Sequence, residues 1–364
     1  MTVLLNATMI GNKSGTGRYC MGVINGFSTI SGRNKDVYEE LIFFIPDGFT
    51  VKNLKCREIN VSDSHISRIM WEQTTLQLNS SSSTIIHGLS FTLPIFYSGK
   101  GVLTVHDMAY KRYPETLLKR KRMYYNFVID RSIRSADIII AITEFTAAEI
   151  SHFFPDVRSK IKVIYPGGGF LPNVTKEESE ETKILYKLNN PYYLTVGTLE
   201  PRKNLEFMLS SYRSYLKEGG EIDLVIVGRR GWLDSNIFEP YQDIINQNKL
   251  HLLGYLSDKE LASLYAESQA LVFPSKYEGF GLPLLECWQM GTAAIIPNAH
   301  ALAEIGRKAA LYFEPGNEES LAECLTQLED PVDLNIYEER GKERAKDFSW
   351  EKCAAELWET YKSL

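Results

Sequence analysis

The stretch from residue 270 to residue 286 constrains the fold of this chain more than any other. A short apolar run, Ala270–Phe273, leads through Pro274 and Ser275 into a segment with two glycines and then into Leu282-Pro283. The apolar run predicts a buried strand, the glycines predict a loop, and the proline predicts the first turn of a helix. Glycine lets the backbone approach a ligand, and the free N–H groups of a helix start attract anions. This unit therefore predicts a site for a phosphate-bearing ligand.

Two acidic residues stand on this unit. Glu278 falls in the glycine loop and Glu286 about one turn into the predicted helix, so we expect both carboxylates to face one pocket. Carboxylates accept hydrogen bonds from hydroxyl groups. An anion held by backbone N–H groups, with a carboxylate on each side, matches the chemistry of a sugar nucleotide.

The rest of the chain alternates between strand and helix patterns, which predicts an α/β fold with parallel sheets covered by helices. At 364 residues the chain suits two domains of about 170–180 residues each. Expected strands are 3–5, 41–45, 84–86, 102–105, 137–141, 161–164, 193–196, 223–227, 251–253, 270–273 and 293–296. Expected helices include 18–30, 119–132, 144–154, 204–218, 258–267 and 284–290. Glycines give way to a polar, acidic stretch between residues 167 and 181, which predicts the break between domains.

Charge and cysteine content narrow the function classes. Residues 1–172 hold 20 Lys and Arg against 14 Asp and Glu, whereas the remainder holds 20 against 32, so a basic first half precedes an acidic second half. The basic half predicts contact with an anionic surface, but it carries no nucleic-acid-binding motif. The five cysteines are scattered, and we see neither a signal peptide nor a membrane-spanning run. These features favour a cytoplasmic protein without disulfides.

The segment Glu278-Gly-Phe-Gly-Leu-Pro-Leu-Leu-Glu286 resembles the Glu-x7-Glu signature of retaining glycosyltransferases of the GT-B type, in glycosyltransferase family 4. The resemblance implies a GT-B fold of two Rossmann-like domains facing across a cleft. It implies an acceptor domain over 1–172, a nucleotide-sugar donor domain over 173–346, and a last helix, 347–364, that crosses back to the first domain. The alternative for that helix is an ordinary last helix of the second domain.

Within this signature the resemblance assigns Gly279, Phe280, Gly281 and Leu282 to the donor diphosphate. It assigns Glu278 to the hydroxyls of the transferred hexose and Glu286 to the ribose. The pair is not a glycosidase pair, because a helix start lies between the two carboxylates.

Two motifs of the first half complete the expected site there. His106-Asp107 ends a strand at the edge where α/β sheets place ligands, and His106 matches the family histidine beside the donor sugar. Asp107 is expected either to orient His106 or to bind the acceptor. Gly15, Thr16 and Gly17 belong to a loop that resembles the family's glycine-rich first loop, which approaches the donor phosphates and the acceptor, although a plain strand–helix turn would look the same.

Two motifs of the second half belong to the expected donor site. Arg202 and Lys203 follow a strand, and Lys203 aligns with the family lysine on the donor diphosphate. Many members carry an arginine where this chain has Thr198, so Arg202 either replaces it or pairs with Glu200. The backbone of Tyr255 and Leu256 is expected near the nucleotide base.

No Asp-x-Asp and no metal-ligand spacing occurs in the sequence, so we expect no metal and no cofactor, with the leaving diphosphate stabilised by Arg202, Lys203 and the helix start. The predicted function is transfer of a hexose, with GDP-mannose as the first candidate donor, to a glycan or lipid-linked oligosaccharide of bacterial surface polysaccharide or O-antigen. Two alternatives stay open: a nucleotide-sugar 2-epimerase of GT-B fold, and a non-catalytic nucleotide-sugar or polyanion-binding protein. A nicotinamide dehydrogenase is disfavoured because the chain lacks Gly-x-Gly-x-x-Gly.

The segment 117–134 combines four consecutive basic residues with aromatic and apolar ones. Such a helix can lie on an anionic membrane, here the inner face of the bacterial plasma membrane, or it can be a helix with a buried aromatic stripe and a charged outer face.

Overall fold

The computed structural model describes residues 2–12, 15–33, 35–49, 51–59, 65–78, 80–81, 84–117, 119–229 and 235–364. The chain divides into two compact units: unit 1 contains Met1–Gly167 and Phe348–Leu364, and unit 2 contains Gly168–Asp347. The division falls a few residues before the boundary expected at 172, and the end of the chain belongs to unit 1.

Unit 1 is built on one parallel sheet of seven strands in the order β3-β2-β1-β4-β5-β6-β7. The strands are β1 (Thr2–Asn6), β2 (Leu41–Pro46), β3 (Lys55–Ile59), β4 (Thr84–Gly88), β5 (Lys100–Val105), β6 (Ile138–Ala141) and β7 (Ile161–Val163). The helices are α1 (Gly15–Ser31), α2 (Lys35–Glu40), α3 (His65–Trp71), the π-helical η1 (Glu72–Leu76), α4 (Ala109–Arg112), η2 (Pro114–Thr116), α5 (Lys119–Ser135), α6 (Glu144–Phe153), η3 (Pro155–Lys160) and α15 (Trp350–Lys362).

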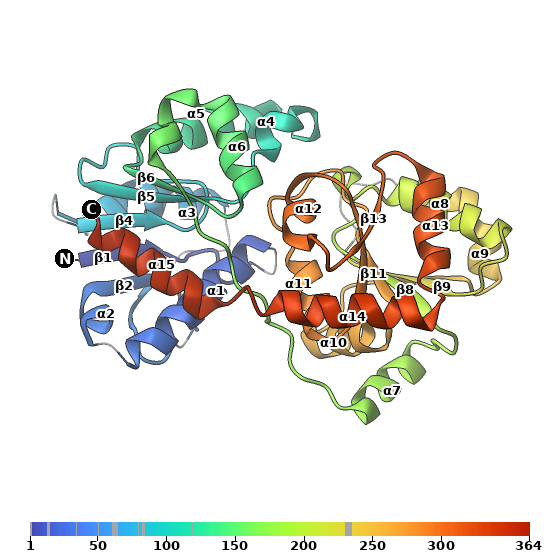
Figure 1. The fold of residues 1–364 in the computed structure, drawn as a ribbon. Helices are drawn as coiled ribbons and strands as arrows, with labels where there is room; N and C mark the ends of the chain where they lie inside the picture. The colour runs from blue at the N-terminus through green and yellow to red at the C-terminus, as the bar shows by residue number, and fades with distance from the viewer. Residues whose placement is uncertain are drawn as a thin grey trace. The chain divides into compact units, whose positions relative to one another are not determined.

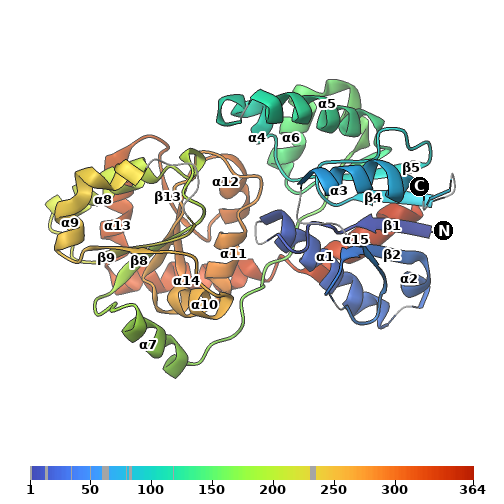
Figure 2. The same cartoon turned by 180° about the vertical axis from the view of Figure 1, so that it is seen from behind.

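Helices cover both faces of this sheet, as its apolar strands require. On one face, Leu76, Ile129 and Ile150 of η1, α5 and α6 share a single core with the strands. Figure 2 shows α3 on the side that α5 and α6 also cover.

The other face carries α1 and α15, which pack along each other although they stand at opposite ends of the sequence (Figure 1). Two glycines of α1 make this contact possible. A Cβ on Gly22 would lie 2.1 Å from the Trp350 ring, and one on Gly26 would lie 2.1 Å from the Trp350 carbonyl oxygen. Replacing either glycine would therefore push the last helix away from the sheet.

Unit 2 contains a parallel sheet of six strands in the order β10-β9-β8-β11-β12-β13. The strands are β8 (Tyr192–Val196), β9 (Asp223–Val227), β10 (Leu250–Leu253), β11 (Ala270–Val272), β12 (Ala293–Pro297) and β13 (Leu311–Phe313). The helices are α7 (Lys176–Leu185), η4 (Pro201–Lys203), α8 (Leu205–Lys217), η5 (Ser235–Tyr241), α9 (Gln242–Asn246), α10 (Asp258–Glu267), α11 (Leu282–Gln289), α12 (His300–Gly306), α13 (Glu318–Gln327) and α14 (Pro331–Ala345). The expectation of two Rossmann-like units with parallel sheets is thus confirmed.

The acidic stretch expected to separate the domains is partly helical. Thr175 caps α7, with its side chain accepting from the backbone of Glu178 and the Glu178 carboxylate accepting from the Thr175 N–H. This reciprocal cap satisfies two otherwise unpaired N–H groups, and the acidic first turn favours the helix dipole. The charges therefore start a helix, which packs against α10.

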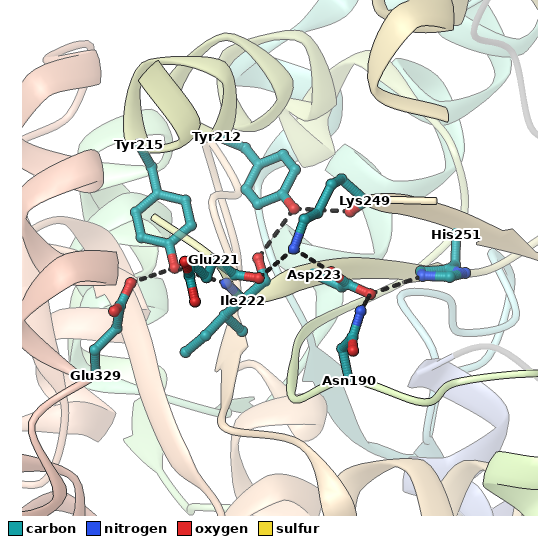
Figure 3. Close-up of polar contacts among 9 residues, drawn as sticks. All are labelled: Asn190, Tyr212, Tyr215, Glu221, Ile222, Asp223, Lys249, His251 and Glu329. Carbon is teal, nitrogen blue, oxygen red and sulfur yellow. Dashed lines mark hydrogen bonds and ion pairs between the residues drawn. The ribbon is translucent and has the colours of Figure 1, made fainter. Parts of the chain in front are cut away.

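The amino ends of β9 and β10 are held by a buried carboxylate (Figure 3). Asp223, which is 2% exposed, accepts from Lys249 at 3.1 Å and from His251 and Asn190 at 3.2 Å. Burial works against its charge, but these donors prevail and lower the pKa of Asp223. This cluster lies at the amino ends of the strands, whereas the loops after β8 and β11 lie at the carboxyl ends.

In the described part of the chain, no helix combines the length and apolar character needed to cross a bilayer.

Candidate functional site

The strand order of unit 2 picks out one place for a ligand. From β8 the chain continues outward to β9 and β10, and then returns to the other side of β8 with β11, β12 and β13. The loops after β8 and β11 therefore diverge, and open α/β sheets bind ligands in the crevice at such a switch point. The loop after β8 carries Arg202 and Lys203, and the loop after β11 carries Glu278, so the structure brings these predicted residues together.

Glu278 is the centre of this group. Its Oε1 lies 2.6 Å from the Lys203 ammonium, and its Oε2 lies 3.2 Å from the Arg202 guanidinium. The Glu278 side chain is only 11% exposed, and those of Lys203 and Arg202 are 18% and 24% exposed. Partial removal from water strengthens both attractions.

The ionisation of Glu278 follows from these contacts. Burial alone would raise the pKa of this carboxyl, but the charges of Lys203 and Arg202 and the hydrogen bond from Lys203 lower it to about 2. The carboxylate is therefore charged at neutral pH and neutralises one of its two cationic partners.

Arg202 forms the expected pair with Glu200 and also contacts the loop after β11. Its Nη2 lies 2.6 Å from Glu200, while its Nη1 donates to the Tyr277 carbonyl at 2.7 Å and lies 3.2 Å from Glu278. The guanidinium thus links the two loops, and Thr198, which stands where many family members have an arginine, lines a small pocket beside Lys203.

That pocket lies between the ends of β8 and β11, with Gly197 on one side and Phe273 on the other. The Lys203 ammonium lies 5.0 Å from the centre of the Phe273 ring, which favours the charge at this position. Gly197 adopts a φ of +154° and its backbone lies close to Gly228, where an added Cβ would come within 1.8 Å of the Gly197 carbonyl oxygen. Glycine at position 228 therefore lets the backbone after β9 lie against Gly197 at the side of the pocket.

The start of α11 has the form that the sequence predicts. Gly281 caps the helix with a φ of +103°, and Pro283 occupies the first turn. A Cβ on Gly281 would lie 2.5 Å from Leu302, so both the conformation and the packing require glycine. Gly279, Phe280 and Leu282 complete this turn, and the first N–H groups of a helix have no intrahelical acceptor.

Glu286 lies one turn into α11 and is 2% exposed, with its Oε2 accepting from the Tyr265 hydroxyl at 3.5 Å. Tyr255 is 48% exposed, and the Arg229 guanidinium carbon lies 4.2 Å from the centre of the Tyr255 ring. Leu256 is buried. Both follow β10.

Sequence reasoning gave no role to Phe273, Tyr277 or His300. The His300 Nε2 donates to the Ser275 carbonyl at 3.1 Å, and the residue opens α12 with a φ of +44°. Burial lowers the pKa of His300, which the charge of Glu278 opposes. An aromatic residue at the end of a strand that leads into a glycine loop was a usable signal for Phe273, whereas nothing in the sequence connects His300 with Ser275.

His106 lies at the carboxyl end of β5 in unit 1 and is 8% exposed. Its Nε2 donates to the Leu89 carbonyl at 2.9 Å, and its ring contacts Tyr19 edge to face at 4.7 Å. Because a carbonyl only accepts, Nε2 carries the proton, and Nδ1 is the acceptor in the neutral ring. Burial lowers the pKa of His106, although Leu89 and Asp107 oppose the shift, so the ring is neutral at pH 7.

The Asp107 side chain forms a hydrogen bond at the start of the helix that follows it. Its Oδ1 accepts from the Ala109 N–H at 2.9 Å, at the start of α4, while the Leu89 carbonyl orients the His106 ring. The carboxylate is half-buried.

The glycine-rich loop after β1 is described only in part, since residues 13 and 14 lie outside the described residues. Gly15, Thr16 and Gly17 form the first turn of α1. A Cβ on Gly17 would lie 1.6 Å from the Asn12 carbonyl oxygen, so this glycine lets the loop backbone lie against the helix start.

Across the described ranges, no three His, Cys, Asp or Glu side chains gather in the manner of a metal site. The group at the switch point offers two cations that share the carboxylate of Glu278, with Arg202 also paired to Glu200, beside the eight-residue helix α11 that Gly281 caps. Such a group can accept a dianionic ligand, because a diphosphate can take the place of the carboxylate on Lys203 and Arg202.

Comparison with known proteins agrees with this geometry. Residues 176–347 match the family model described as Glycosyl transferases group 1, and residues 76–167 match that of Glycosyltransferase Family 4. The O-antigen chain mannosyltransferase B of Escherichia coli is 31% identical over 287 residues, which cover 77% of this chain and 74% of that protein. The serotype-specific mannosyltransferase WbdA of E. coli is 27% identical over 258 residues, which cover 68% of this chain but only 31% of WbdA.

Among solved structures, HepE of Anabaena in complex with UDP and glucose aligns over the full length of both chains with a TM-score of 0.75 at 15% identity, which shows the fold alone. The family matches and the E. coli mannosyltransferase together establish that this chain belongs to glycosyltransferase family 4 and has a GT-B fold.

Proposed function

We propose that this glycosyltransferase moves a hexose from a nucleoside-diphosphate sugar, first of all GDP-mannose, to a glycan or lipid-linked oligosaccharide in bacterial surface-polysaccharide synthesis. The observation that carries the proposal is the pairing of Glu278 with Lys203 and Arg202 at the switch point of unit 2. A ligand with both phosphate and hydroxyl groups would use all three side chains at once.

Donor binding exchanges partners within this group. The diphosphate takes Lys203 and Arg202, with help from the N–H groups at Gly279–Leu282, and this exchange frees Glu278 to accept from hexose hydroxyls. Glu286, one turn further along α11, accepts from the ribose hydroxyls. As the bond to the sugar breaks, negative charge grows on the leaving diphosphate, where the two cations already lie.

We propose that the transfer retains the anomeric configuration and needs no metal. Metal independence is supported by Lys203 and Arg202, which supply the charge that a divalent cation would otherwise provide. Retention follows from the family resemblance of His106, Lys203, Glu278 and Glu286. A neutral His106 with Nδ1 as acceptor suits a hydrogen bond from a donor hydroxyl rather than the neutralisation of phosphate.

The mannosyl donor is proposed from the relatives, since two E. coli relatives are named as mannosyltransferases. The proposal places the protein in the cytoplasm, where nucleotide sugars are made, with its acceptor at the inner face of the plasma membrane. We accordingly also expect the segment 117–134 to contact that membrane.

A thermal-shift screen followed by a transfer assay tests the proposal. GDP-mannose, UDP-glucose, UDP-GlcNAc and dTDP-rhamnose are each added with and without EDTA, because a ligand that binds the folded state raises the melting temperature. We expect one of them to give an EDTA-insensitive rise that is lost in Glu286→Ala and kept in the exposed-residue control Glu218→Gln.

The transfer assay then uses that donor and membrane extract as the acceptor source, with the anomeric configuration of the product read by NMR. Retained configuration in a glycan product supports the proposal. Epimerised nucleotide sugar without an acceptor would establish the isomerase instead, and binding without turnover would establish the non-catalytic alternative.

A further inference from the structure

Tyr19 of α1 contacts two residues at the carboxyl end of β5 at once. Its hydroxyl lies 3.3 Å from the Thr104 hydroxyl, and its ring meets the His106 ring at 4.7 Å with the two planes at 89°. Thr104 and His106 are two positions apart, and residues of this spacing on a strand face the same side of the sheet. Tyr19, which is only 2% exposed, therefore spans both residues from that side.

The hydrogen bond from His106 to the Leu89 carbonyl does not fix the whole ring. It holds one atom, Nε2, and the torsion that sets the plane of a histidine ring has broad minima. The Tyr19 ring and the Phe91 ring, 5.2 Å from His106, restrict this plane. Phe91 adopts a φ of +63°, which is unfavourable for a bulky side chain and is the kind of strain that collects at functional sites. The orientation of the His106 ring thus depends on two packed aromatic side chains.

A buried chain of polar groups fixes Tyr19 in turn. The Thr104 hydroxyl also lies 2.9 Å from Nε2 of His87 on β4, and Nδ1 of His87 lies 2.5 Å from the Tyr361 hydroxyl on α15. A hydroxyl has one proton and two lone pairs, so Thr104 can bond both of its neighbours. Burial lowers the pKa of His87 to about 3 and raises the pKa values of both tyrosines, so every member of the chain is neutral at pH 7.

The last helix also contacts Tyr19 directly. The Trp350 ring, at the start of α15, lies 5.6 Å from the Tyr19 ring, and α15 packs along α1 (Figure 1). Two aromatic neighbours and one hydrogen-bonded hydroxyl thus determine where Tyr19 lies.

We propose that Tyr19 is the positioning residue of His106 in hexose transfer, and that the chain of Thr104, His87 and Tyr361 fixes Tyr19. Tyr19 acts through His106, by setting the plane in which Nδ1 accepts a hydrogen bond from a hydroxyl of the donor sugar. A displacement of about 1 Å in a catalytic group can lower a rate by about two orders of magnitude. The inference rests on the proposed role of His106 and adds the residues that make this role possible.

Three variants separate the ring of Tyr19 from its hydroxyl and from the chain. Tyr19→Leu removes the ring, and Tyr19→Phe keeps the ring without its hydroxyl. Thr104→Val removes the hydroxyl that contacts both Tyr19 and His87.

Tyr97 offers matched controls within the same unit. Its hydroxyl donates to the carbonyls of Ser81 and Thr84, at the amino end of β4, whereas His106 follows the carboxyl end of β5. Tyr97→Leu and Tyr97→Phe therefore make the same chemical changes away from His106.

Steady-state kinetics with the donor selected by the thermal-shift screen give the first readout. We expect kcat of Tyr19→Leu to fall by about tenfold to a hundredfold. The donor KM and the affinity for the free nucleoside diphosphate should stay close to the wild-type values, because Lys203 and Arg202 belong to unit 2. Tyr19→Phe should restore kcat to within about fivefold of the wild type, the effect of one hydrogen bond.

The double variant Tyr19→Phe, Thr104→Val tests the chain. If the Thr104 hydroxyl acts on His106 through Tyr19, Thr104→Val should lower kcat in the wild type but not further in Tyr19→Phe. Additive losses of kcat would overturn the role of the chain.

NMR of the protein with isotope-labelled histidine gives a second readout that requires no activity. Long-range proton–nitrogen correlation identifies the tautomer of each ring, and the His106 signals are those that His106→Gln removes. Wild-type His106 should be protonated on Nε2 alone, as its bond to Leu89 requires. Tyr19→Leu should add the second tautomer because the freed ring can turn away from Leu89, whereas Tyr97→Leu should match the wild type.

Loss of kcat at an unchanged KM in Tyr19→Leu, recovery in Tyr19→Phe and a second His106 tautomer would support the proposal. A folded Tyr19→Leu with wild-type kcat and a single tautomer would overturn it. So would an equal loss of kcat in Tyr97→Leu, which would indicate general destabilisation.

If Tyr19→Leu does not fold, Tyr19→Phe and Thr104→Val decide: a lower kcat at an unchanged KM supports the proposal, and wild-type kcat in both overturns it. A wild type that transfers no hexose would refute the proposed function instead. The His106 tautomers in wild type, Tyr19→Leu and Tyr97→Leu would then decide alone whether Tyr19 sets the ring.

Discussion

Replacing Glu278 by glutamine tests two roles of this residue, the ion pairs with Lys203 and Arg202 and the proposed binding of hexose hydroxyls. Glu278 is ionised between Lys203 and Arg202, and its pKa is lowered from 4.5 to about 2. Each pKa unit is about 1.4 kcal/mol of preference for the charged form, so the neutral variant should lose about 3 kcal/mol of folding free energy at pH 7. For a unit of this size that loss lowers the melting temperature by roughly 6–12 °C.

The pH dependence provides the sharper assay. A carboxyl whose pKa is lower in the folded state contributes its full stabilisation above the unfolded value, here 4.5, and loses it as the pH falls toward 2. Denaturant unfolding of the wild type and Glu278→Gln should therefore differ by about 3 kcal/mol at neutral pH, and the two should converge as the pH falls through this window. The exposed control Glu218→Gln should match the wild type throughout.

The same variant should change ligand binding in opposite directions. GDP or UDP alone should bind more tightly to Glu278→Gln, since the diphosphate no longer competes with a carboxylate for Lys203 and Arg202. Hexose transfer should fall, because the variant has lost the acceptor of the hexose hydroxyls. A variant as stable as the wild type at pH 7, or a difference that does not change with pH, would refute the reasoning.

Three further predictions concern the packing of both units. Asp223→Asn should cost about 3 kcal/mol in denaturant unfolding at pH 7, because it puts a neutral amide in place of the buried carboxylate that Lys249, His251 and Asn190 face (Figure 3), and this cost should shrink below the ordinary pKa of 3.8. Gly281→Ala should destabilise by about 1–3 kcal/mol and weaken donor binding, and more so than Gly219→Ala, where φ is also positive but an added Cβ meets nothing. Tyr361→Phe should cost about 1–3 kcal/mol by equilibrium unfolding, since it removes the 2.5 Å contact of its hydroxyl with the buried Nδ1 of His87.

The strands that could be predicted from the sequence are those with a buried apolar run. The expected strand 223–227 matches β9, in which all five residues are buried. The edge strand β3 was missed because only its last residue, Ile59, is buried, and its polar residues pair with β2 alone. β13, the edge strand of the sheet in unit 2, was missed because a strand of three residues is too short to show an alternating pattern.

Helix starts could have been predicted better than they were. The capping box of Thr175 and Glu178 is visible in the sequence, yet the charged composition around it suggested a linker. Expected helix 258–267 agrees with α10, which begins with the same kind of cap from Ser257 and Glu260.

Within the site, local features could be predicted from the sequence, but the pairing of distant residues could not. The glycine loop and the start of α11 follow from local rules, because Gly281 needs a positive φ and Pro283 fits the first turn. The pairing of Lys203 with Glu278 joins residues 75 positions apart, and it arises because β8 and β11 are neighbours in the sheet. Strand order is a property of the whole fold, so family resemblance was needed to connect the two motifs.

Isothermal titration of the donor selected by the thermal-shift screen, first of all GDP-mannose, tests the central claim most directly. The titration compares the wild type with Lys203→Met and with Lys276→Met, an exposed lysine on the adjacent loop. A charged hydrogen bond to the diphosphate predicts a loss of about tenfold to a hundredfold in Lys203→Met and no change in Lys276→Met. Equal affinity in Lys203→Met and the wild type would contradict the account, because the diphosphate would then bind somewhere other than the switch point of unit 2.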